Sequence, residues 1–321
     1  MKTVIVTGCF GFIGTYVTKT CLAQGWRVMG IDKLTYCSDI QKGSETFPFN
    51  SGNGWRNFKF LKQDINDIEY LPEVDYIINT AAETHVDNSI VGNHEFVNSN
   101  INGVHHILEL IRNKRGYNMP TLLHFSTDEV YGDITTGSHT ETDILKPSNP
   151  YSATKAAADM LIQGWNRTYN VPYVIVRPTN NYGVGQYIEK LIPKSVKYLT
   201  LNKLIPLHNN GTPVRSWLHA QDTANAVITI IESGVKNEIY NIGGSCEKSN
   251  IEVVYKIIDE YYARSVSNRN QYIDFSTHRQ GQDIRYSLDD NKLRKLGWKP
   301  TKIFENELTN IVKFYTHQFI W

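Results

Sequence analysis

The segment Val4-Ile5-Val6-Thr7-Gly8-Cys9-Phe10-Gly11-Phe12-Ile13-Gly14 places a short apolar strand directly before three spaced glycines and the start of a helical pattern. A strand, a glycine turn and a helix in this order are typical of the fingerprint that binds a dinucleotide. The glycines let the backbone come close to a pyrophosphate, which then lies at the N-terminus of the following helix. Three glycines alone are a weak signal, so the strands that follow must support this interpretation.

A second strand, Arg27-Val28-Met29-Gly30-Ile31-Asp32, ends in an acidic residue. The carboxylate of Asp32 can accept hydrogen bonds from a ribose diol and would repel a 2′-phosphate, so the pattern favours NAD over NADP. Residues 35–55 are polar and rich in Gly, Ser and Asn, which predicts a loop that partly covers the cofactor. A third strand at 58–61 is followed by Asp64 and Ile65, which are well placed to meet the adenine.

Later strands alternate with helices, which predicts an α/β fold with a Rossmann-type, doubly wound parallel sheet. The strands are expected at 74–79, 122–125 and 173–177, and the helices at 94–114 and 151–169. After residue 178 the pattern changes to shorter elements, with helices near 188–201, 221–233, 251–262 and 304–319 and a short strand at 239–242. We therefore predict an NAD-binding Rossmann domain that carries the catalytic residues at 1–178. Residues 179–321 are predicted to form mainly a smaller, mixed, substrate-binding subdomain.

The strongest chemical signal is the stretch Ser126-Thr127-Asp128-Glu129-Val130-Tyr131-Gly132, which follows the apolar strand at 122–125. Open α/β sheets bind their ligands at the carboxyl ends of the strands, so chemistry is expected there. Downstream, Tyr151 and Lys155 share one helical face, and an ammonium beside a phenol favours the phenolate. Tyr151 is therefore a candidate base. Each half has a structural alternative, because such a Tyr-Lys pair also occurs on helix surfaces and an Asp-Glu pair also occurs in solvated turns.

Composition excludes several classes of partner. The chain of 321 residues has a formal net charge of +1 at pH 7, and it shows neither a basic block nor an acidic tail, so we expect no nucleic acid and no membrane surface as a partner. The cysteines, which are Cys9, Cys21, Cys37 and Cys246, lack metal-ligand spacing, and we predict no metal site. We see no secretory signal and no apolar run of membrane-spanning length, so we expect a cytoplasmic enzyme.

These motifs together resemble the nucleotide-sugar (dTDP-/UDP-glucose) 4,6-dehydratases of the extended short-chain dehydrogenase/reductase superfamily. The likeness continues through Asn180-Asn181-Tyr182-Gly183, Asn241-Ile242-Gly243-Gly244 and Leu296-Gly297-Trp298-Lys299-Pro300, and so covers nearly the whole chain. The Thr-Asp-Glu triplet is the specific element. The resemblance implies conversion of an NDP-glucose to an NDP-4-keto-6-deoxyglucose with a retained NAD, a step toward rhamnose-type deoxysugars.

The resemblance also assigns roles to the catalytic residues. Tyr151, poised by Lys155 and helped by Thr127, removes the 4-hydroxyl proton while hydride leaves C4. Glu129 then takes the C5 proton and Asp128 protonates the departing 6-hydroxyl. Hydride returns to C6, so there is no net redox change and the enzyme is a lyase.

The remaining implied contacts fall into two sets. The cofactor set is Gly8, Gly11, Phe12, Ile13, Gly14, Asp32, Lys33, Leu34, Thr35, Asp64, Ile65, Thr80, Ala81, Ala82, Ser99, Tyr151, Lys155 and Asn181. The substrate set is Thr84, Thr127, Asp128, Glu129, Asn180, Lys190, Leu191, Pro206, Leu207, His208, Arg215, Asn250, Arg279 and Gln282. Arg215 and Arg279 suit a diphosphate because a guanidinium offers a planar fork of donors.

One segment departs from the bacterial pattern, because His278-Arg279-Gln280-Gly281-Gln282 stands where bacterial members usually carry Asp-Arg-Pro-Gly-His. Other details, such as Tyr36-Cys37-Ser38 and Pro206-Leu207-His208, look more like the UDP-glucose dehydratase domain of plant-type rhamnose synthases. The resemblance therefore suggests UDP-glucose, with dTDP-glucose as the alternative. It also implies a homodimer formed through the helices near 94–114 and 151–169.

Two other functions remain open at this point. A UDP-sugar 4-epimerase shares the glycine fingerprint and the Tyr-Lys pair, but it needs no acid and base at C5 and C6. A non-catalytic NAD-sensing protein shares the fold, although such proteins typically lose the Tyr-Lys pair that this chain retains.

Overall fold

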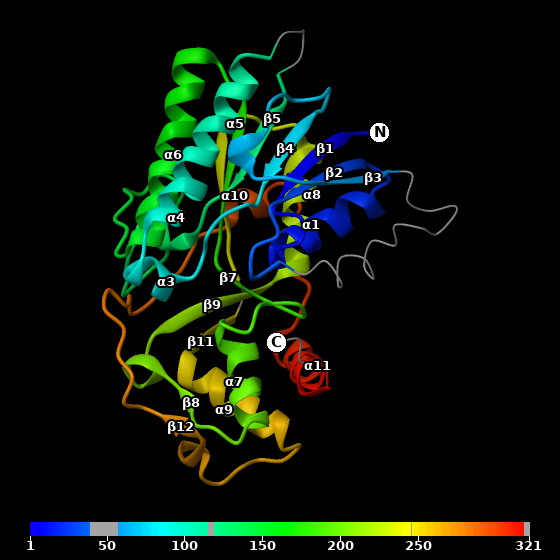
Figure 1. The fold of residues 1–321 in the computed structure, drawn as a ribbon. Helices are drawn as coiled ribbons and strands as arrows, with labels where there is room; N and C mark the ends of the chain where they lie inside the picture. Colours follow the sequence, from blue (N-terminus) through cyan, green and yellow to red (C-terminus); the bar gives the residue numbers. More distant parts are fainter. Residues whose placement is uncertain (39–56, 115–118, 245, 318–321) are drawn as a thin grey trace.

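The computed structural model describes residues 1–38, 57–114, 119–244 and 246–317, and it consists of a large α/β part and a smaller mixed part (Figure 1). Most of the loop predicted at 35–55 lies outside the described residues. No helix among the described residues combines the length and the apolar composition needed to cross a bilayer.

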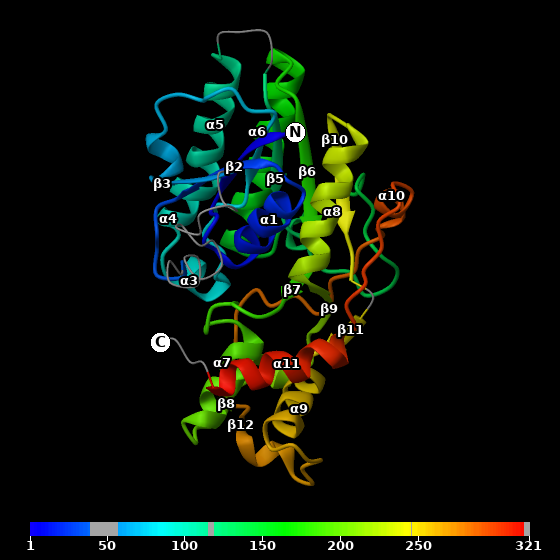
Figure 2. The ribbon, with the colours of Figure 1, turned by 90° about the vertical axis from the view of Figure 1, so that its right-hand side faces the viewer.

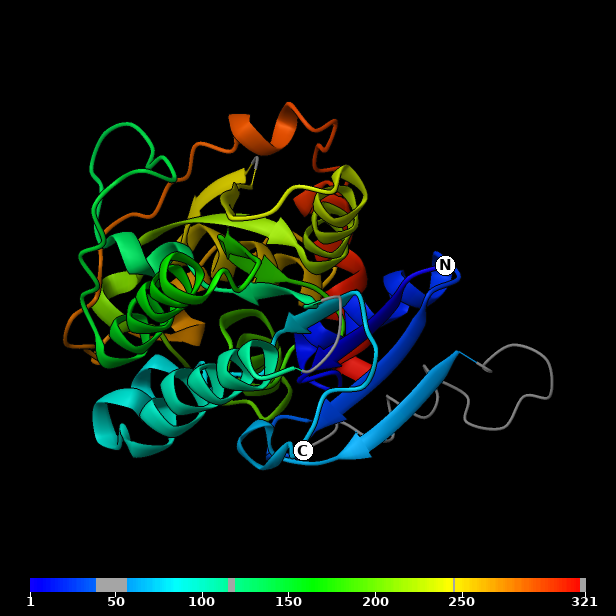
Figure 3. The same ribbon diagram turned by 90° about the horizontal axis from the view of Figure 1, so that it is seen from above.

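The large part is built on a seven-stranded sheet in which every neighbouring pair is parallel. In spatial order the strands are β10 (Glu238–Ile242), β6 (Tyr173–Pro178), β5 (Thr121–Phe125), β4 (Tyr76–Asn79), β1 (Thr3–Thr7), β2 (Arg27–Asp32) and β3 (Phe58–Lys62). Seen from above, they run from β3 at one edge toward β10 at the other (Figure 3). This arrangement confirms the predicted fold class.

Helices cover both faces of the sheet. Helices α1 (Phe12–Ala23) and α8 (Ala220–Ser233) lie on one face, and α5 (Gly103–Arg112) and α6 (Pro150–Tyr169) lie on the other (Figures 1 and 2). Successive strand residues point to opposite faces, so Val4 and Val6 pack with α1 and α8 while Ile5 packs with α5 and α6. Strands buried on both faces need continuous apolar runs, which is why the central strands β1, β4, β5 and β6 show no regular polar alternation.

Two short helices and one irregular turn lie between β4 and α5. Helices α3 (Val86–Val91) and α4 (His94–Val97) lead into a π-helical turn at Asn98–Asn102, and α5 follows directly. The helix predicted at 94–114 is therefore present, but it is not a single regular α-helix. The π-helical turn packs against α6.

The smaller part lies beyond the carboxyl ends of the large sheet (Figure 2). It contains a mixed sheet of β11 (Cys246–Ser249), β9 (Val214–His219) and β7 (Asn180–Tyr182), and a pair formed by β12 (Ile273–Asp274) and β8 (Ile205–Pro206). Its helices are α7 (Leu191–Thr200), α9 (Asn250–Tyr261) and α11 (Phe304–His317), which share a second apolar core. The short helix α10 (Asn291–Arg294) packs against β10 of the large part.

The chain returns to the large part after it has entered the smaller one. Strand β10 pairs with β6 from Glu238 to Ile242, and Tyr240 and Ile242 are buried in the core under α1 and α8. The strand predicted at 239–242 is thus present, but it extends the large sheet rather than the smaller part. The division at residue 178 stays a prediction.

Candidate active site

The glycine turn after β1 is closely packed. Gly8 has φ of +66°, and a Cβ added there would lie 2.8 Å from the Ala81 nitrogen. A Cβ on Gly14 would overlap the Gly8 carbonyl oxygen, so α1 can start this close to β1 only with glycine at that position. The turn therefore exposes backbone beside the N-terminus of α1, which suits a pyrophosphate. The residues present fit the dinucleotide that the sequence predicts.

Asp32 at the end of β2 is buried and holds the neighbouring loops. Its Oδ2 accepts a hydrogen bond from the Phe10 amide at 3.0 Å, and its Oδ1 accepts from the Leu34 amide at 2.8 Å and the Ser38 hydroxyl at 3.0 Å. A carboxylate has about four acceptor positions, and among the described residues one position on Oδ2 has no donor, which suits a ribose hydroxyl.

Most of the predicted cofactor residues line one pocket at the carboxyl ends of β1, β2, β3 and β4, which we call the glycine-turn pocket. The predicted residues that line it are Gly8, Gly11, Asp32, Lys33, Thr35, Asp64, Ile65, Thr80, Ala81, Ala82 and Ser99. Its wall also contains Ile31, Cys37, Ser38, Gln63 and Glu83, which were not predicted.

The other predicted cofactor residues lie outside this lining. Phe12, Ile13 and Gly14 form the first turn of α1, and Leu34 has a left-handed backbone with φ of +62°. Asn181 donates to the Thr179 carbonyl and accepts from the Thr223 hydroxyl, so its amide connects β7 to α8. The structure thus gives Asn181 a structural role in addition to the predicted one.

The chain turns sharply after β5. Thr127 caps a short 3-10 helix at Asp128–Tyr131, where its hydroxyl accepts a hydrogen bond from the Glu129 amide at 3.3 Å. Gly132 ends the turn with φ of +78°, and a Cβ there would overlap the carbonyl oxygen of Lys146. The turn aims two adjacent carboxyls into a buried site at the carboxyl end of the sheet.

The two carboxyls have different partners. Asp128 is 2% exposed, and its Oδ1 and Oδ2 accept from the hydroxyls of Thr127 at 3.1 Å and Thr179 at 2.9 Å. Burial and the neighbouring charge of Glu129 raise the pKa of Asp128 to about 7. Burial also raises the pKa of Glu129, which accepts from the Asn149 amide at 3.2 Å. Two carboxyls with raised pKa values in one buried site are a functional signal rather than a solvated turn.

Tyr151 lies in the first turn of α6, immediately after the helix cap. Asn149 and Ser152 form a capping box and Pro150 occupies the first helical position, so the start of this helix is firmly set. Burial, followed by the charges of Glu129 and Asp128, holds the pKa of Tyr151 well above its ordinary value, and only the hydrogen bond with Thr127 opposes this shift. Tyr151 is therefore a neutral phenol in the protein chain alone, and its role as a base stays a prediction.

Lys155 is 2% exposed and lies one helical turn after Tyr151. Its Nζ is 3.3 Å from Nε2 of His124, a buried residue of β5. Burial lowers the pKa of Lys155 to about 8, although the charge of Asp159 opposes this. Lys155 is thus still mainly an ammonium at neutral pH.

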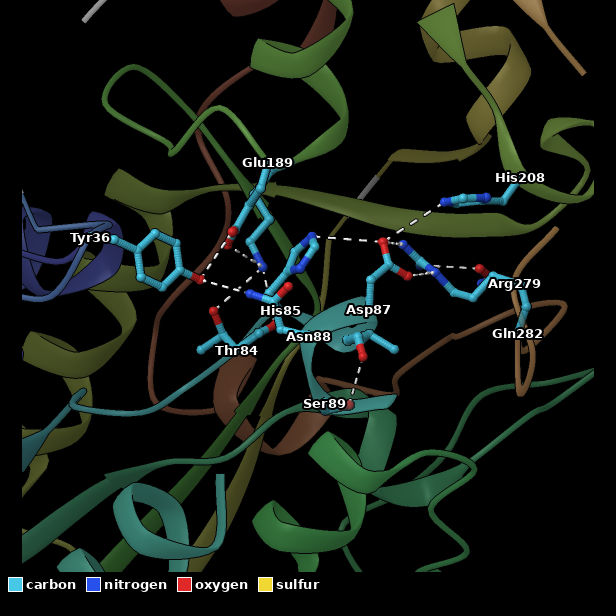
Figure 4. Close-up of polar contacts among 12 residues, drawn as sticks. Tyr36, Thr84, His85, Asp87, Asn88, Ser89, Glu189, His208, Arg279 and Gln282 are labelled. Atoms are coloured by element: carbon cyan, nitrogen blue, oxygen red, sulfur yellow. Dashed lines mark hydrogen bonds and ion pairs between the residues drawn. The ribbon is translucent and has the colours of Figure 1, made fainter. Parts of the chain in front are cut away.

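Several predicted substrate residues gather around the segment that leads into α3 (Figure 4). Asp87 Oδ1 accepts from Nε of Arg279 at 2.6 Å, and its Oδ2 is 3.0 Å from Nη2 of the same guanidinium. His208 Nε2 is 3.8 Å from Asp87 Oδ2, and Nη1 of Arg279 donates to Gln282 at 3.2 Å. The nearby His208 and the hydrogen bonds from Arg279 hold the pKa of Asp87 well below its usual range. His208, Arg279 and Gln282, which lie far apart in sequence from Asp87, are therefore brought together at one cleft wall.

A second set of contacts joins the two parts of the molecule beside this wall. Lys190 Nζ donates to the Thr84 carbonyl at 3.1 Å. Tyr36 donates from its hydroxyl to Glu189 at 3.1 Å, and that hydroxyl accepts from Asn88 at 3.4 Å (Figure 4). The predicted contacts Thr84 and Lys190 thus touch each other across the cleft.

Arg215 is mostly buried between the parts. Its Nη1 and Nη2 donate to the carbonyls of Val214 at 2.7 Å and Asp283 at 3.0 Å, and its guanidinium lies 4.4 Å above the ring of Tyr286. Its charge lowers the pKa values of Asp128 and Glu129, against the larger effect of burial. Because Nη1 and Nη2 of Arg215 already donate to backbone carbonyls, some donors of the guanidinium are in use.

The remaining predicted substrate residues lie in the smaller part. Asn180 lies in β7, Leu191 begins α7, Pro206 lies in β8 and Asn250 begins α9. Leu207 is buried in the second core, its amide donates to the Asp274 carbonyl, and it caps the short 3-10 helix at His208–Gly211.

Comparison with known proteins places this site in a family. A profile of the family described as GDP-mannose 4,6 dehydratase matches residues 5–311. The chain belongs to this family. It is an NAD-dependent nucleotide-sugar 4,6-dehydratase, a hydro-lyase of the extended short-chain dehydrogenase/reductase superfamily, as the resemblance predicted.

Individual relatives agree with this placement. A dTDP-glucose 4,6-dehydratase of Haemophilus influenzae is 38% identical, over 98% of this chain and 98% of that protein. A trifunctional UDP-glucose 4,6-dehydratase/UDP-4-keto-6-deoxy-D-glucose 3,5-epimerase/UDP-4-keto-L-rhamnose-reductase of Arabidopsis thaliana is 37% identical over 100% of this chain. This chain covers only 48% of the length of that protein. The crystal structure of DesIV, a dTDP-glucose 4,6-dehydratase from Streptomyces venezuelae with NAD and TYD bound, has a TM-score of 0.89 at 33% identity, with 98% of this chain and 97% of that chain covered. Solved 4-epimerases are only 22–23% identical, and likeness at that level shows the fold alone.

Three residues of the dehydratase site were missed from the sequence. Asn149 contacts Glu129, Thr179 contacts Asp128 and His124 contacts Lys155. Asn149 precedes a proline at the start of a helical pattern, which is a helix-cap signal that could have found it. His124 interrupts an apolar strand, whereas Thr179 has no comparable signal.

Proposed function

We propose that this dehydratase removes water from an NDP-glucose and yields the NDP-4-keto-6-deoxyglucose, a step toward rhamnose-type deoxysugars. The observation that carries this proposal is the pair of the buried Asp128 and the half-buried Glu129, which share one site with Tyr151 and have raised pKa values. A 4-epimerase needs only the Tyr-Lys pair, so a paired acid and base at the same site favour dehydration.

The first step assigns proton removal to Tyr151. NAD, when bound, accepts hydride from C4 and returns it to C6. Tyr151 takes the proton of the 4-hydroxyl as general base, and the Thr127 hydroxyl, which donates to Asp128 in the structure, would turn to donate to the phenolate. Because the pKa of Tyr151 is raised in the protein chain alone, the Lys155 ammonium must favour the phenolate, and the positive charge of a bound NAD would add to this effect.

The second step divides the work between the two carboxyls. A ketone at C4 acidifies the C5 proton, and Glu129 removes it. Asp128 protonates the departing 6-hydroxyl, which suits a carboxyl with a pKa of about 7 because a large fraction is still protonated at neutral pH. Glu129 later returns a proton to C5.

The experiment that tests this function uses the purified chain with UDP-glucose and dTDP-glucose in separate reactions. Mass spectrometry should detect loss of one water from the hexose, and no net NADH should form. Epimerisation without loss of mass would favour the 4-epimerase. Bound NAD without turnover of any NDP-sugar would favour the NAD-sensing protein.

We propose UDP-glucose as the preferred substrate, with dTDP-glucose as the alternative. The preference is supported by the plant-type motifs such as Tyr36-Cys37-Ser38, while relatives named for each nucleotide are almost equally similar. The two bases differ by one methyl group, which is worth about 1–3 kcal/mol in a pocket, so even the correct preference can be a modest ratio of kcat/KM. A clear excess of kcat/KM for dTDP-glucose would reverse it.

We also propose a homodimer formed through α4, α5 and α6. The neighbouring helices α3, α4 and α6 expose several apolar side chains, namely Ile90, Val91, Val97 and Met160. Met160→Glu should shift the mass measured by light scattering toward a monomer. Ile303→Glu, which alters a comparably exposed side chain before α11, serves as the control and should leave the mass unchanged.

The proposed compartment is the cytoplasm. All four cysteines are free thiols, of which Cys9 and Cys21 are buried, and this agrees with a reducing environment.

A further inference from the structure

Asn149 uses the two ends of its side-chain amide for two different contacts. Its Oδ1 accepts a hydrogen bond from the Ser152 backbone amide at 2.9 Å, which caps α6. Its Nδ2 donates to Oε2 of Glu129 at 3.2 Å. The side chain is buried, with 8% of it exposed. One amide therefore joins the start of the helix that carries Tyr151 to one of the two carboxyls of the site.

The helix cap fixes the orientation of this amide. A backbone N–H can only donate, so the atom of Asn149 that faces the Ser152 amide must be the oxygen. Turning the amide over would bring two donors together at Ser152 and would place an oxygen against the Glu129 carboxylate. The nitrogen of Asn149 therefore faces Glu129, and the contact does not depend on a choice between two equivalent orientations.

The cap alone does not require asparagine. Serine and aspartate cap helices as well as asparagine does. A serine hydroxyl ends one bond short of the position that the amide nitrogen of Asn149 occupies, and an ionised aspartate has no proton to donate. Asparagine provides the acceptor for the cap and a donor on a separate atom, so its N–H has a use of its own at Glu129.

The Glu129 carboxyl has no second donor in the part of the chain that the structure describes. Asn149 donates to Oε2, and Oε1 accepts no hydrogen bond from a described residue. The charged and titratable groups around this carboxyl are Asp128, Tyr151, Lys190, Arg215, Asp283 and Tyr286. A neutral N–H donor stabilises the carboxylate and fixes its orientation, whereas a direct ion pair would make it a much weaker base.

We propose that Asn149 is a positioning residue for the C5 base: its N–H holds Oε2 of the Glu129 carboxylate and leaves Oε1 to take the C5 proton. This rests on the proposed function, in which Glu129 is that base. Because the same amide caps α6, it also fixes Glu129 relative to Tyr151. The bases of the first and second steps are thus held by one side chain.

The first test does not depend on turnover. Carbon NMR of protein labelled at the glutamate carboxyl, with Glu129 assigned from the Glu129→Gln variant, follows the titration of this group without substrate. Asn149→Ser keeps the cap and removes the donor, so Glu129 should titrate about one pH unit higher, because a hydrogen bond to the charged form is lost. Asn149→Asp also keeps the cap and should raise that pH further, since a carboxylate at a helix N-terminus stays ionised and repels Glu129.

Unchanged titration of Glu129 in both variants would overturn the proposal. If the wild type shows the expected titration but removes no water from any NDP-glucose, the proposed function fails while the contact between Asn149 and Glu129 stands.

The second test separates the two steps in single turnover with UDP-glucose. Appearance of NADH reports oxidation at C4, and its disappearance with loss of mass reports water loss and the return of hydride. Asn149→Ser should slow the second phase about tenfold more than the first. Glu129 must be ionised to act as a base, so the acidic limb of the second phase should move to higher pH by about one unit.

Asn149→Ala is the matched control, because it removes the cap as well as the donor. It should lower the melting temperature below that of Asn149→Ser and move the limb by the same amount. Equal slowing of both phases by Asn149→Ser, or wild-type rates in that variant, would overturn the proposal, because Asn149 would then act only through the helix cap.

Discussion

Replacing Asp128 by Asn should make the protein more stable while it disables water loss. An amide has nearly the shape of a protonated carboxyl. Its oxygen can accept from Thr127 and its N–H can donate to Thr179, whose own hydroxyl proton then goes to the Ser216 carbonyl at 3.0 Å. The variant therefore keeps the local hydrogen bonds and removes a group that is costly to ionise in a buried site.

The size of the effect follows from the pKa. Folding raises the pKa of Asp128 from 3.8 to about 7, so the ionised form is less stable in the folded than in the unfolded state. The stability associated with the protonated carboxyl is present below about pH 4 and is lost as the pH rises toward about 7. At about 1.4 kcal/mol per pKa unit, the loss between pH 5 and pH 8 is about 2–3 kcal/mol in the wild type and absent in Asp128→Asn.

Urea unfolding of both proteins at pH 5 and pH 8, without cofactor, measures this difference. The difference in free energy of unfolding between Asp128→Asn and the wild type should grow by about 2–3 kcal/mol from pH 5 to pH 8. For a chain of this size this corresponds to about 4 °C in melting temperature. The rate of water loss should fall by about two to four orders of magnitude because the general acid is missing. A variant that is no more stable at pH 8, or whose advantage is the same at both pH values, would refute the reasoning.

A second buried carboxyl provides the control. Asp222 is 1% exposed and accepts from the backbone amides of Thr301 and Lys302 at 3.1 Å and 2.9 Å. In one orientation, the amide of Asp222→Asn places an N–H where an acceptor is needed. In the other orientation its oxygen accepts both bonds but lacks the charge that strengthens them. This variant should be less stable than the wild type at both pH values.

Three further variants test the site. Glu129→Gln should still oxidise C4 but stall before water is lost, so absorbance from bound NADH should accumulate on mixing with NDP-glucose; absence of that absorbance would mean that Glu129 acts earlier. Asp32→Ala should weaken NAD binding in calorimetry by about tenfold, since the ribose diol loses its acceptor, and unchanged affinity would remove Asp32 from the cofactor site. Gly14→Ala should abolish NAD binding or folding because the added Cβ overlaps the Gly8 carbonyl oxygen, and normal NAD affinity would contradict the close packing of that turn.

Local pattern was enough to predict the large sheet. Strands β1, β4, β5 and β6 are short runs of mainly apolar residues and each helix has its own periodicity, so the alternation of strands and helices could be read without any knowledge of contacts. The edge strand β10 was harder to place, because the five residues Glu238–Ile242 carry no signal of which sheet they join. Its position was decided by pairing with β6 and by the burial of Tyr240 and Ile242 under α1 and α8.

The active-site residues divide in the same way, into what could be predicted from the sequence and what depended on the fold. The sequence by itself determined the glycine turn, the acid at the end of β2 and the motifs that contain Asp128, Glu129, Tyr151 and Lys155, because each depends on residue type at short spacing. Their chemical state was decided only by the tertiary structure. Burial raised the pKa of Asp128, its partner Thr179 came from the residue between β6 and β7, and the partner of Lys155, His124, came from β5. Asp87 met Arg279 across 192 positions of sequence. A pKa and a donor count depend on what packs around a group, and that packing is a property of the folded chain rather than of any segment.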